Sequence, residues 1–542
     1  MDAAASVEVE AQGGPGGQEV RGRSRSPSWS WLCQRPLWTV TVLFVVSRLA
    51  FFGAGVRFDL SPLLARRFTT MQLLSTGLLK HHLVSSVWDL NSQPPLFNLY
   101  SGLLLKLPSG GREPVAVVTF AALGLVLVLC TYAAMVELHV PTWLALLVTA
   151  LIIVDPAFVL YENWLSYGYP TAALVTFGVL ALARYVRTGN RLWGLGFFAA
   201  AALVVLLDSS FQYLWLAAVV AAVVVGLRGG RRTVVLVALV PVALVAGWAV
   251  KDAVQFGTIT TSSWLGMNLA KTTISAAGPT RVDALVRSHV LTPFAEVPTF
   301  GGVRVYVPHW VRPSHTGSAA LDQSVRSDGS PNFNNLAYVA AAKKYLHEDL
   351  AFIRADPGFY TATVAKSAAL AMVPPDEYSF LAGNRSHIGG WARLYDATVM
   401  VQPGDDPNPA GPALYFGKGP SPSQVSYTTL LALGLTIVGS PFLIWRWRRR
   451  DRGSAVTLTF LWLTVVYLLA TTSLIEFGEN NRYTMSVGPL PVIAGAAVVT
   501  AVVRALFGHP PSPAPPSPRP GGALGEAPQP TTAEDVPSIL VP

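Results

Sequence analysis

The chain has 542 residues, of which 51% are hydrophobic and only 13% are charged, and its mean hydropathy is +0.44. A soluble protein carries roughly a quarter charged residues, so this composition predicts an integral membrane protein. The net charge of +9 comes from short arginine runs between apolar segments. That distribution is typical of cytoplasmic membrane loops and argues against a nucleic-acid partner.

The two ends of the chain have compositions that cannot form a hydrophobic core. Residues 1–36 are rich in Gly, Ser and Arg, which predicts a disordered cytoplasmic tail. No small-residue cleavage site follows the first apolar stretch, so we expect that stretch to remain as a membrane anchor. The Pro-rich residues 506–542 predict a second disordered cytoplasmic tail.

Ten apolar segments are long enough to cross a bilayer, which takes about 20 residues and at least about 17. They predict an all-α polytopic membrane protein with about ten, and at most twelve, transmembrane helices. The predicted spans are residues 37–55, 114–136, 142–160, 168–186, 192–208, 210–227, 233–250, 426–445, 455–475 and 484–505.

Three arginine clusters orient these spans. They are Arg184 to Arg191, Arg228 to Arg232, and Arg446 to Arg452. All three fall on the cytoplasmic side if the short apolar segments 96–107 and 359–373 do not span. We therefore expect those two segments to be re-entrant or surface-lying helices.

This topology divides the chain into a membrane part and an elaborate outer face. Residues 37–250 form an N-terminal transmembrane module whose first outer loop is 56–113, and residues 251–425 form a large extracytoplasmic loop or subdomain. Residues 426–505 form the C-terminal transmembrane helices. A loop as long as 251–425 is usually functional, so we expect the active site outside and both termini inside.

Three acidic residues of the outer face are candidates for catalysis. Asp59 stands just beyond the first span and could accept a proton from a hydroxyl, although a surface aspartate paired with a neighbouring arginine is the plainer interpretation. Asp89 could instead cap the chain before Pro94 and Pro95. Glu162 lies among aromatic residues that include Trp164, a setting that suits a sugar ring.

Basic and amide side chains complete the candidate site. Arg482, in the segment 479–483, can grip a phosphate with two parallel hydrogen bonds. A solvated basic helix end is the plainer interpretation of Lys80 and His81, although they would also suit an anionic head group. The adjacent residues His81 and His82 point about 100° apart on a helix, so no metal site is assigned.

The sequence lacks the motifs of nucleotide-driven and metal-dependent enzymes. It contains no Walker phosphate-binding loop, no Rossmann glycine fingerprint at the start of a strand and no HExxH helix. We therefore expect no cofactor, and the free energy of any reaction must come with the substrate.

In the order of these features the chain resembles the polytopic glycosyltransferases of the GT-C class, nearest to family 39, the protein mannosyltransferase and aminoarabinose transferase type. The resemblance covers residues 37–505. It rests on the early Asp59, on the stretch Gln93-Pro94-Pro95-Leu96-Phe97, on the acidic-aromatic turn at Glu162, and on Glu479-Asn480-Asn481-Arg482-Tyr483. Two positions depart from the family pattern: Leu60 stands where a glutamate is frequent, and Gln93 replaces a histidine.

The resemblance implies a GT-C-like helix bundle that transfers a hexosyl or pentosyl group from a polyprenyl-phosphate sugar, with inversion, at the extracytoplasmic face. Asp59 would be the base and Asp89 its rival, with Glu162 as a second acid. Arg482 would bind the donor phosphate, helped by Lys80 and His81. The remaining substrate contacts would come from Gln93, Trp164, Glu479, Asn481 and Tyr483.

The acceptor implied by the resemblance is a glycan, lipid or protein of the cell envelope. Two other classes of function stay open. One is a lipid or polysaccharide transporter or flippase, for which the spans carry few of the charged residues that mark a translocation path. The other is a non-catalytic membrane scaffold for envelope assembly.

Overall fold

The computed structural model describes residues 35–64, 70–227, 231–307, 309–312, 315–404 and 419–508. Both predicted tails therefore lie almost entirely outside the described residues. Within these ranges the chain is helical, and its only β-type pairings are two isolated bridges. The expected all-α class is confirmed.

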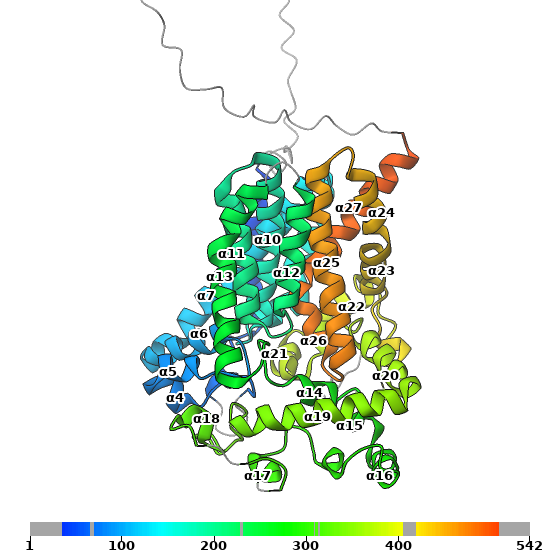
Figure 1. Ribbon diagram of the computed structural model, residues 1–542. Coiled ribbons are helices and arrows are strands. Elements are labelled where there is room, and N and C mark those ends of the chain that lie inside the picture. The colour runs from blue at the N-terminus through cyan, green and yellow to red at the C-terminus, as the bar shows by residue number, and fades with distance from the viewer. Residues whose placement is uncertain are drawn as a thin grey trace, which may run out of the picture.

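Long apolar helices form one bundle (Figure 1). Among the described residues, seven helices are long and apolar enough to cross a membrane. They are α2 (Pro36–Gly53), α7 (Ser109–Glu137), α10 (Gly168–Thr188), α13 (Arg231–Phe256), the continuous α23–α24 unit (Tyr427–Trp447), α25 (Arg452–Ile475) and α27 (Pro489–Leu506).

An eighth candidate span is broken. Helices α8 (Thr142–Val154) and α9 (Pro156–Glu162) meet at an angle of 56°. Pro156 has no backbone N–H to continue α8, and it occupies the first turn of α9, where the Asp155 side chain accepts a hydrogen bond from the Ala157 N–H at 2.8 Å. The proline and its capping aspartate therefore explain the bend.

The expectation of ten spans was too high by this measure. The two remaining segments are helical where we expected them, but α11 (Arg191–Leu207) has 17 residues and α12 (Tyr213–Gly226) has 14. At 1.5 Å per residue α12 is only about 21 Å long, against a hydrocarbon core of about 30 Å. The polar turn between them, residues 208–212, shortens both helices.

The two short apolar segments are short helices in the structure. Helix α6 (Pro95–Lys106) has 12 residues and ends before Pro108, and α20 (Pro357–Leu370) has 14. Figure 1 places α6 with α4 (Thr76–His81) and α5 (Leu83–Trp88) at the edge of the bundle, and α20 at one end of it. Neither α6 nor α20 is long enough to cross a membrane.

One end of the bundle carries a separate helical layer (Figure 1). Its longest member, α19 (Leu336–Ala355), is surrounded by a hydrophobic core of its own, which includes Phe294, Tyr306, Tyr338 and Tyr345. Helix α14 (Leu265–Leu269) packs directly on the α19 backbone. The contact is so close that a Cβ at Gly266 would collide with the Ala342 carbonyl, so this position requires glycine. The layer also contains the short helices α15 (Ile274–Ala277), α16 (Pro279–Arg287), α17 (Val303–Tyr306) and α18 (Ala319–Asp322).

The arginine-bearing turns lie together at the opposite end. In Figure 1 the α10–α11 turn, the start of α13 and the α24–α25 turn are all at the end of the bundle away from α19. The expected grouping of these turns on one side therefore holds. Glu137, at the end of α7, binds both Arg184 and Arg187 there, with N–O distances of 2.5 Å.

Candidate functional site

The chain that leaves α2 pairs with the turn that follows α9. Asp59 donates its backbone N–H to the Asn163 carbonyl at 2.8 Å, and Leu165 donates its own to the Asp59 carbonyl at 3.1 Å. These two bonds form a short parallel bridge between Asp59 and Trp164. The bridge holds the Asp59 carboxylate beside the Trp164 indole.

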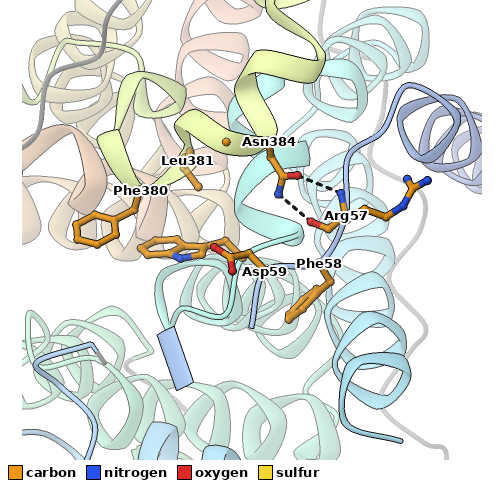
Figure 2. A pocket seen from close by; sticks show the side chains of 8 residues that line it. Arg57, Phe58, Asp59, Phe380, Leu381 and Asn384 are labelled. Carbon is orange, nitrogen blue, oxygen red and sulfur yellow. Dashed lines mark hydrogen bonds between the residues drawn. The ribbon is translucent and has the colours of Figure 1, made fainter. Parts of the chain in front are cut away.

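A cavity of about 280 Å³ opens at this bridge. It is lined by Arg57, Phe58, Asp59, Trp164, Phe380, Leu381, Gly383 and Asn384. Three segments that are far apart in the chain therefore build it: the exit of α2, the turn after α9, and residues 380–384, which span the end of the short helix η3 (Ser379–Leu381) and the start of α21 (Ala382–His387). Figure 2 shows Asp59, Phe380, Leu381 and Asn384 around the cavity, with the Arg57 guanidinium pointing away from it.

Aromatic and carboxylate groups share the cavity wall. The Phe380 ring stacks on the Trp164 indole, with 6.2 Å between ring centroids and an angle of 22°. One Asp59 oxygen, Oδ1, accepts the Ser61 N–H at 2.8 Å. Within the described residues, no hydrogen bond reaches the other Asp59 oxygen, which is therefore able to accept a proton or a hydroxyl.

Asn384 fixes the opposite wall. Its amide donates to the Arg57 carbonyl at 2.8 Å and accepts the Arg57 N–H at 3.1 Å, the two dashed bonds in Figure 2. The sequence could be taken for a glycosylation acceptor at this position. In the structure the amide instead ties α21 to the chain just before Asp59.

A second polar centre surrounds Arg482 on the short helix α26 (Asn480–Thr484). The Arg482 side chain is only 10% exposed and its Nη2 lies 2.9 Å from Glu479 Oε2. Its Nε and Nη2 atoms are buried and make no hydrogen bond of good geometry. The guanidinium lies 4.6 Å from the Tyr483 ring centroid and 5.6 Å from that of Tyr378.

The charges around Arg482 keep its partner ionised. Burial alone would raise the pKa of Glu479, but Arg482, Lys271 and a hydrogen bond from the Tyr378 hydroxyl at 3.0 Å outweigh it, so the pKa is lowered. Lys271 also binds Glu476 at 2.7 Å. The centre thus holds two cations, and the hydrogen-bonding capacity of the more buried one, Arg482, is only partly used within the described residues.

Tyr378 and Trp164 connect the two centres. Their ring centroids are 5.8 Å apart, so Trp164 contacts the Asp59 cavity on one side and Tyr378 on the other. Tyr378 in turn contacts both Glu479 and Arg482. Trp164 and Tyr378 therefore link the wall of the Asp59 cavity to the Arg482 centre.

Glu162 is bound inside the bundle. Arg48 on α2 donates from Nε to both Glu162 oxygens, at 2.9 and 3.1 Å, and from Nη2 at 2.8 Å. The Tyr169 hydroxyl adds a third donor at 2.7 Å. A Cβ at Gly124 on α7 would collide with this carboxylate, so only glycine leaves room for it.

Asp89 is also held by protein donors. Gln255 binds one of its oxygens at 2.8 Å and Ser318 the other at 2.5 Å. It lies at the end of α5 and does not line the Asp59 cavity. Of these predicted site residues, Asp59 and Trp164 line the same cavity, and Asp89 does not.

The other predicted site residues are distributed between the Arg482 centre and the edge of the molecule. Lys80 and His81 are exposed on α4, which packs against α5 and α6. Gln93 is buried in the segment that precedes α6. Asn481 donates to the Pro374 carbonyl at 3.4 Å, and Tyr483 contacts Arg482.

Four contributing residues were missed from the sequence: Tyr378, Phe380, Asn384 and Lys271. The closely spaced rings Tyr378 and Phe380, just after Pro374-Pro375, were a local signal for two of them. The charge pattern held another, because an arginine inside a predicted span, Arg48, calls for a carboxylate partner.

No protein-family model matches the sequence, and no curated protein matches it. Among solved structures, the chain is similar to the archaeal oligosaccharyltransferase AglB from Archaeoglobus fulgidus, in complex with an inhibitory peptide and a dolichol-phosphate. The two share 13% sequence identity, with a TM-score of 0.36 over 90% of this chain and 53% of that one. The chain thus spans about half the length of AglB, and the similarity is distant.

Proposed function

We propose that this protein is an integral membrane glycosyltransferase that transfers a sugar from a polyprenyl-phosphate donor to an acceptor hydroxyl. The observation that carries the proposal is the joined pair of centres. A carboxylate with one unbonded oxygen lies in an aromatic cavity, and a buried arginine with unbonded nitrogens lies beyond Trp164 and Tyr378.

The Asp59 cavity supports sugar transfer by its shape and chemistry. Sugar rings stack on aromatic faces while their hydroxyls bind acids and amides, and the cavity offers Trp164, Phe380 and Asp59 together. The unbonded oxygen of Asp59 is placed to accept the proton of an acceptor hydroxyl. Asp89 offers no such oxygen, which makes Asp59 the base in our proposal.

The Arg482 centre supports an anionic leaving group. A phosphate oxygen could use the buried Nε, which makes no hydrogen bond within the described residues, and could share Nη2 with Glu479. A preorganised cation in a site shielded from water stabilises a developing negative charge more than a solvated one does. Lys271 and the surrounding tyrosines would add further positive charge and donors.

The proposed reaction is a single displacement. The acceptor hydroxyl gives its proton to Asp59, and its oxygen forms a bond to the anomeric carbon. The bond between that carbon and the phosphate oxygen breaks, and its electron pair leaves with the polyprenyl phosphate, which Arg482 binds. Attack from the side opposite the phosphate inverts the anomeric centre.

Glu162 has a different part in this proposal. Its carboxylate is saturated by Arg48 and Tyr169, so it has little capacity left for a substrate. It lies two residues before Trp164, whose backbone pairs with Asp59. We propose that the Arg48–Glu162 pair positions Trp164 and Asp59 instead of acting on the sugar.

Lipid binding tests the donor assignment. The full chain would be purified in mild detergent and its bound lipids identified by mass spectrometry, with added mannosyl and arabinofuranosyl polyprenyl phosphates as hexosyl and pentosyl probes. We expect a prenyl phosphate lipid on the wild type and on Asp59→Asn, and loss of it in a folded Arg482→Gln variant. Equal retention by Arg482→Gln, or no prenyl phosphate on any form, would refute the assignment.

A further inference from the structure

The α24–α25 turn, residues 446–452, carries a dense and uncompensated positive charge. We call this segment the basic turn. Its five arginines are all exposed: Arg446, Arg448, Arg449, Arg450 and Arg452. Among the described residues, none of the five forms an ion pair with a carboxylate.

The single acid of the basic turn is already engaged. Asp451 binds His139 Nε2 and the Ser454 hydroxyl, both at 2.6 Å, and it caps α25 through the Ser454 N–H at 3.0 Å. Burial opposes ionisation, but these partners outweigh it and lower the pKa of Asp451 to about 2. The carboxylate therefore stays charged while it is directed to the α7–α8 turn.

The neighbouring arginines at the same end of the bundle behave differently. Arg184 and Arg187 both bind Glu137, whose side chain is buried at 4% exposure. Glu137 therefore compensates part of the charge of that cluster. Orientation of the chain during insertion would be served by either cluster, so it does not explain why the arginines of the basic turn form no ion pair with the described residues.

The surroundings of the basic turn fit the surface of a bilayer. It follows α24, part of a candidate span, whose last residues expose Phe442 at 63% and Trp445 at 58%. Tryptophan at such a position is typical of the head-group region. The Arg448 guanidinium lies 5.8 Å from the Trp445 ring centroid, at the boundary between apolar and charged surface.

We infer that the basic turn is a binding site for the head groups of anionic phospholipids. Several arginines next to a membrane helix attract acidic lipid, and each contributes about fivefold in affinity near the surface. The planar guanidinium also matches phosphate with two parallel hydrogen bonds. This site lies at the opposite end of the bundle from Asp59 and Arg482, and it is independent of the proposed function.

The test uses the full chain in lipid nanodiscs or detergent and compares phosphatidylglycerol with phosphatidylcholine. Native mass spectrometry would count the retained lipids on the wild type and on the triple variant Arg448→Gln/Arg449→Gln/Arg450→Gln. The matched control, Arg287→Gln/Arg304→Gln/Arg312→Gln, removes the same charge from exposed arginines of the helical layer around α19.

We expect the wild type and the control to retain phosphatidylglycerol in preference to phosphatidylcholine, and the basic-turn variant to bind it about 100-fold more weakly. Higher salt should weaken the binding further. Equal retention of the two lipids, or an equal loss in the control, would overturn the inference. Displacement of the lipid by millimolar glycerol phosphate would also overturn it, because the ligand would then be a free anion.

Discussion

Two buried arginine–glutamate pairs differ in what their arginines still offer to a ligand. Each Arg48 nitrogen has a protein acceptor: Nε and Nη2 bind Glu162, while Nη1 binds Ser47 and the Ile153 carbonyl. Arg482 lies close to Glu479 but leaves Nε and Nη2 without hydrogen bonds. We call Arg48–Glu162 the complete pair, because every arginine nitrogen has a protein acceptor. We call Arg482–Glu479 the open pair, because its arginine still has donor capacity for a ligand.

The difference teaches how to separate a structural charge from a functional one. Removing one partner of a buried pair leaves the other charge uncompensated, which destabilises a protein strongly. A buried donor with no partner is instead destabilising from the start, unless a ligand satisfies it. We therefore propose that the Arg48–Glu162 pair stabilises the fold and that Arg482 binds phosphate.

Breaking the complete pair should have the largest effect. Glu162→Gln leaves the Arg48 charge uncompensated in the bundle, so we expect the free energy of unfolding to fall by about 3 to 5 kcal/mol. The measurement is thermal unfolding in detergent, together with sugar transfer per folded molecule. A variant with normal unfolding but no transfer would show that Glu162 acts in the chemistry and would erase the distinction between the pairs.

A conservative change at the open pair should affect activity more than stability. Arg482→Lys keeps the charge beside Glu479 but loses the planar arrangement of donors. We expect transfer to fall about 100-fold, close to 2.7 kcal/mol in activation free energy. Unfolding should shift by less than about 1 kcal/mol, and a large loss of stability with normal transfer in the folded fraction would reverse the assignment.

The aromatic wall next to Trp164 should have a moderate effect. Phe380 is 56% exposed and stacks on Trp164, so Phe380→Ala removes a ring contact at little cost to the core. We expect KM for the sugar-bearing substrate to rise about fivefold, equivalent to about 1 kcal/mol of stacking, with kcat nearly unchanged. Steady-state kinetics measure both constants. Leu394→Ala, at an exposed apolar position outside the cavity, is the control and should leave KM unchanged.

The smallest effect should come from acid titration of the open pair. The pKa of Glu479 is lowered in the folded protein, so its stabilising contribution is present above the ordinary glutamate pKa, near 4.5, and is lost as pH falls through the lower folded value. The difference in melting temperature between wild type and Glu479→Gln should therefore be constant from pH 7 to pH 5 and shrink below pH 4.5. A difference that grows on acidification would contradict the direction of this shift.

The fold was predictable in outline because apolar length is a local property of the sequence. All ten predicted spans correspond to helical segments, but the polar turn at Asp208 leaves α12 too short to count as a span. The site was predictable only in part. Asp59 and Trp164 were both named as candidates, but their backbone pairing depends on a register between distant segments that no local pattern encodes.

The same reason explains the missed residues. Phe380 and Asn384 reach the Asp59 cavity from more than 300 positions along the chain, through the stacking of Phe380 on Trp164 and the packing of α21 on α9. Glu162 was selected for its aromatic neighbours, while Arg48 lay unremarked in the first predicted span. Pairing the two would have required weighing the cost of an isolated charge inside a bundle.

Sugar transfer by Asp59→Asn tests the central claim most directly. The assay would follow mannosyl or arabinofuranosyl transfer from the polyprenyl phosphate donor that the wild type accepts, with Asp89→Asn as the matched control. Our account predicts that Asp59→Asn lowers transfer by at least about 100-fold while unfolding and donor binding stay normal, and that Asp89→Asn keeps most of the activity. Full transfer by a folded Asp59→Asn protein would contradict the account.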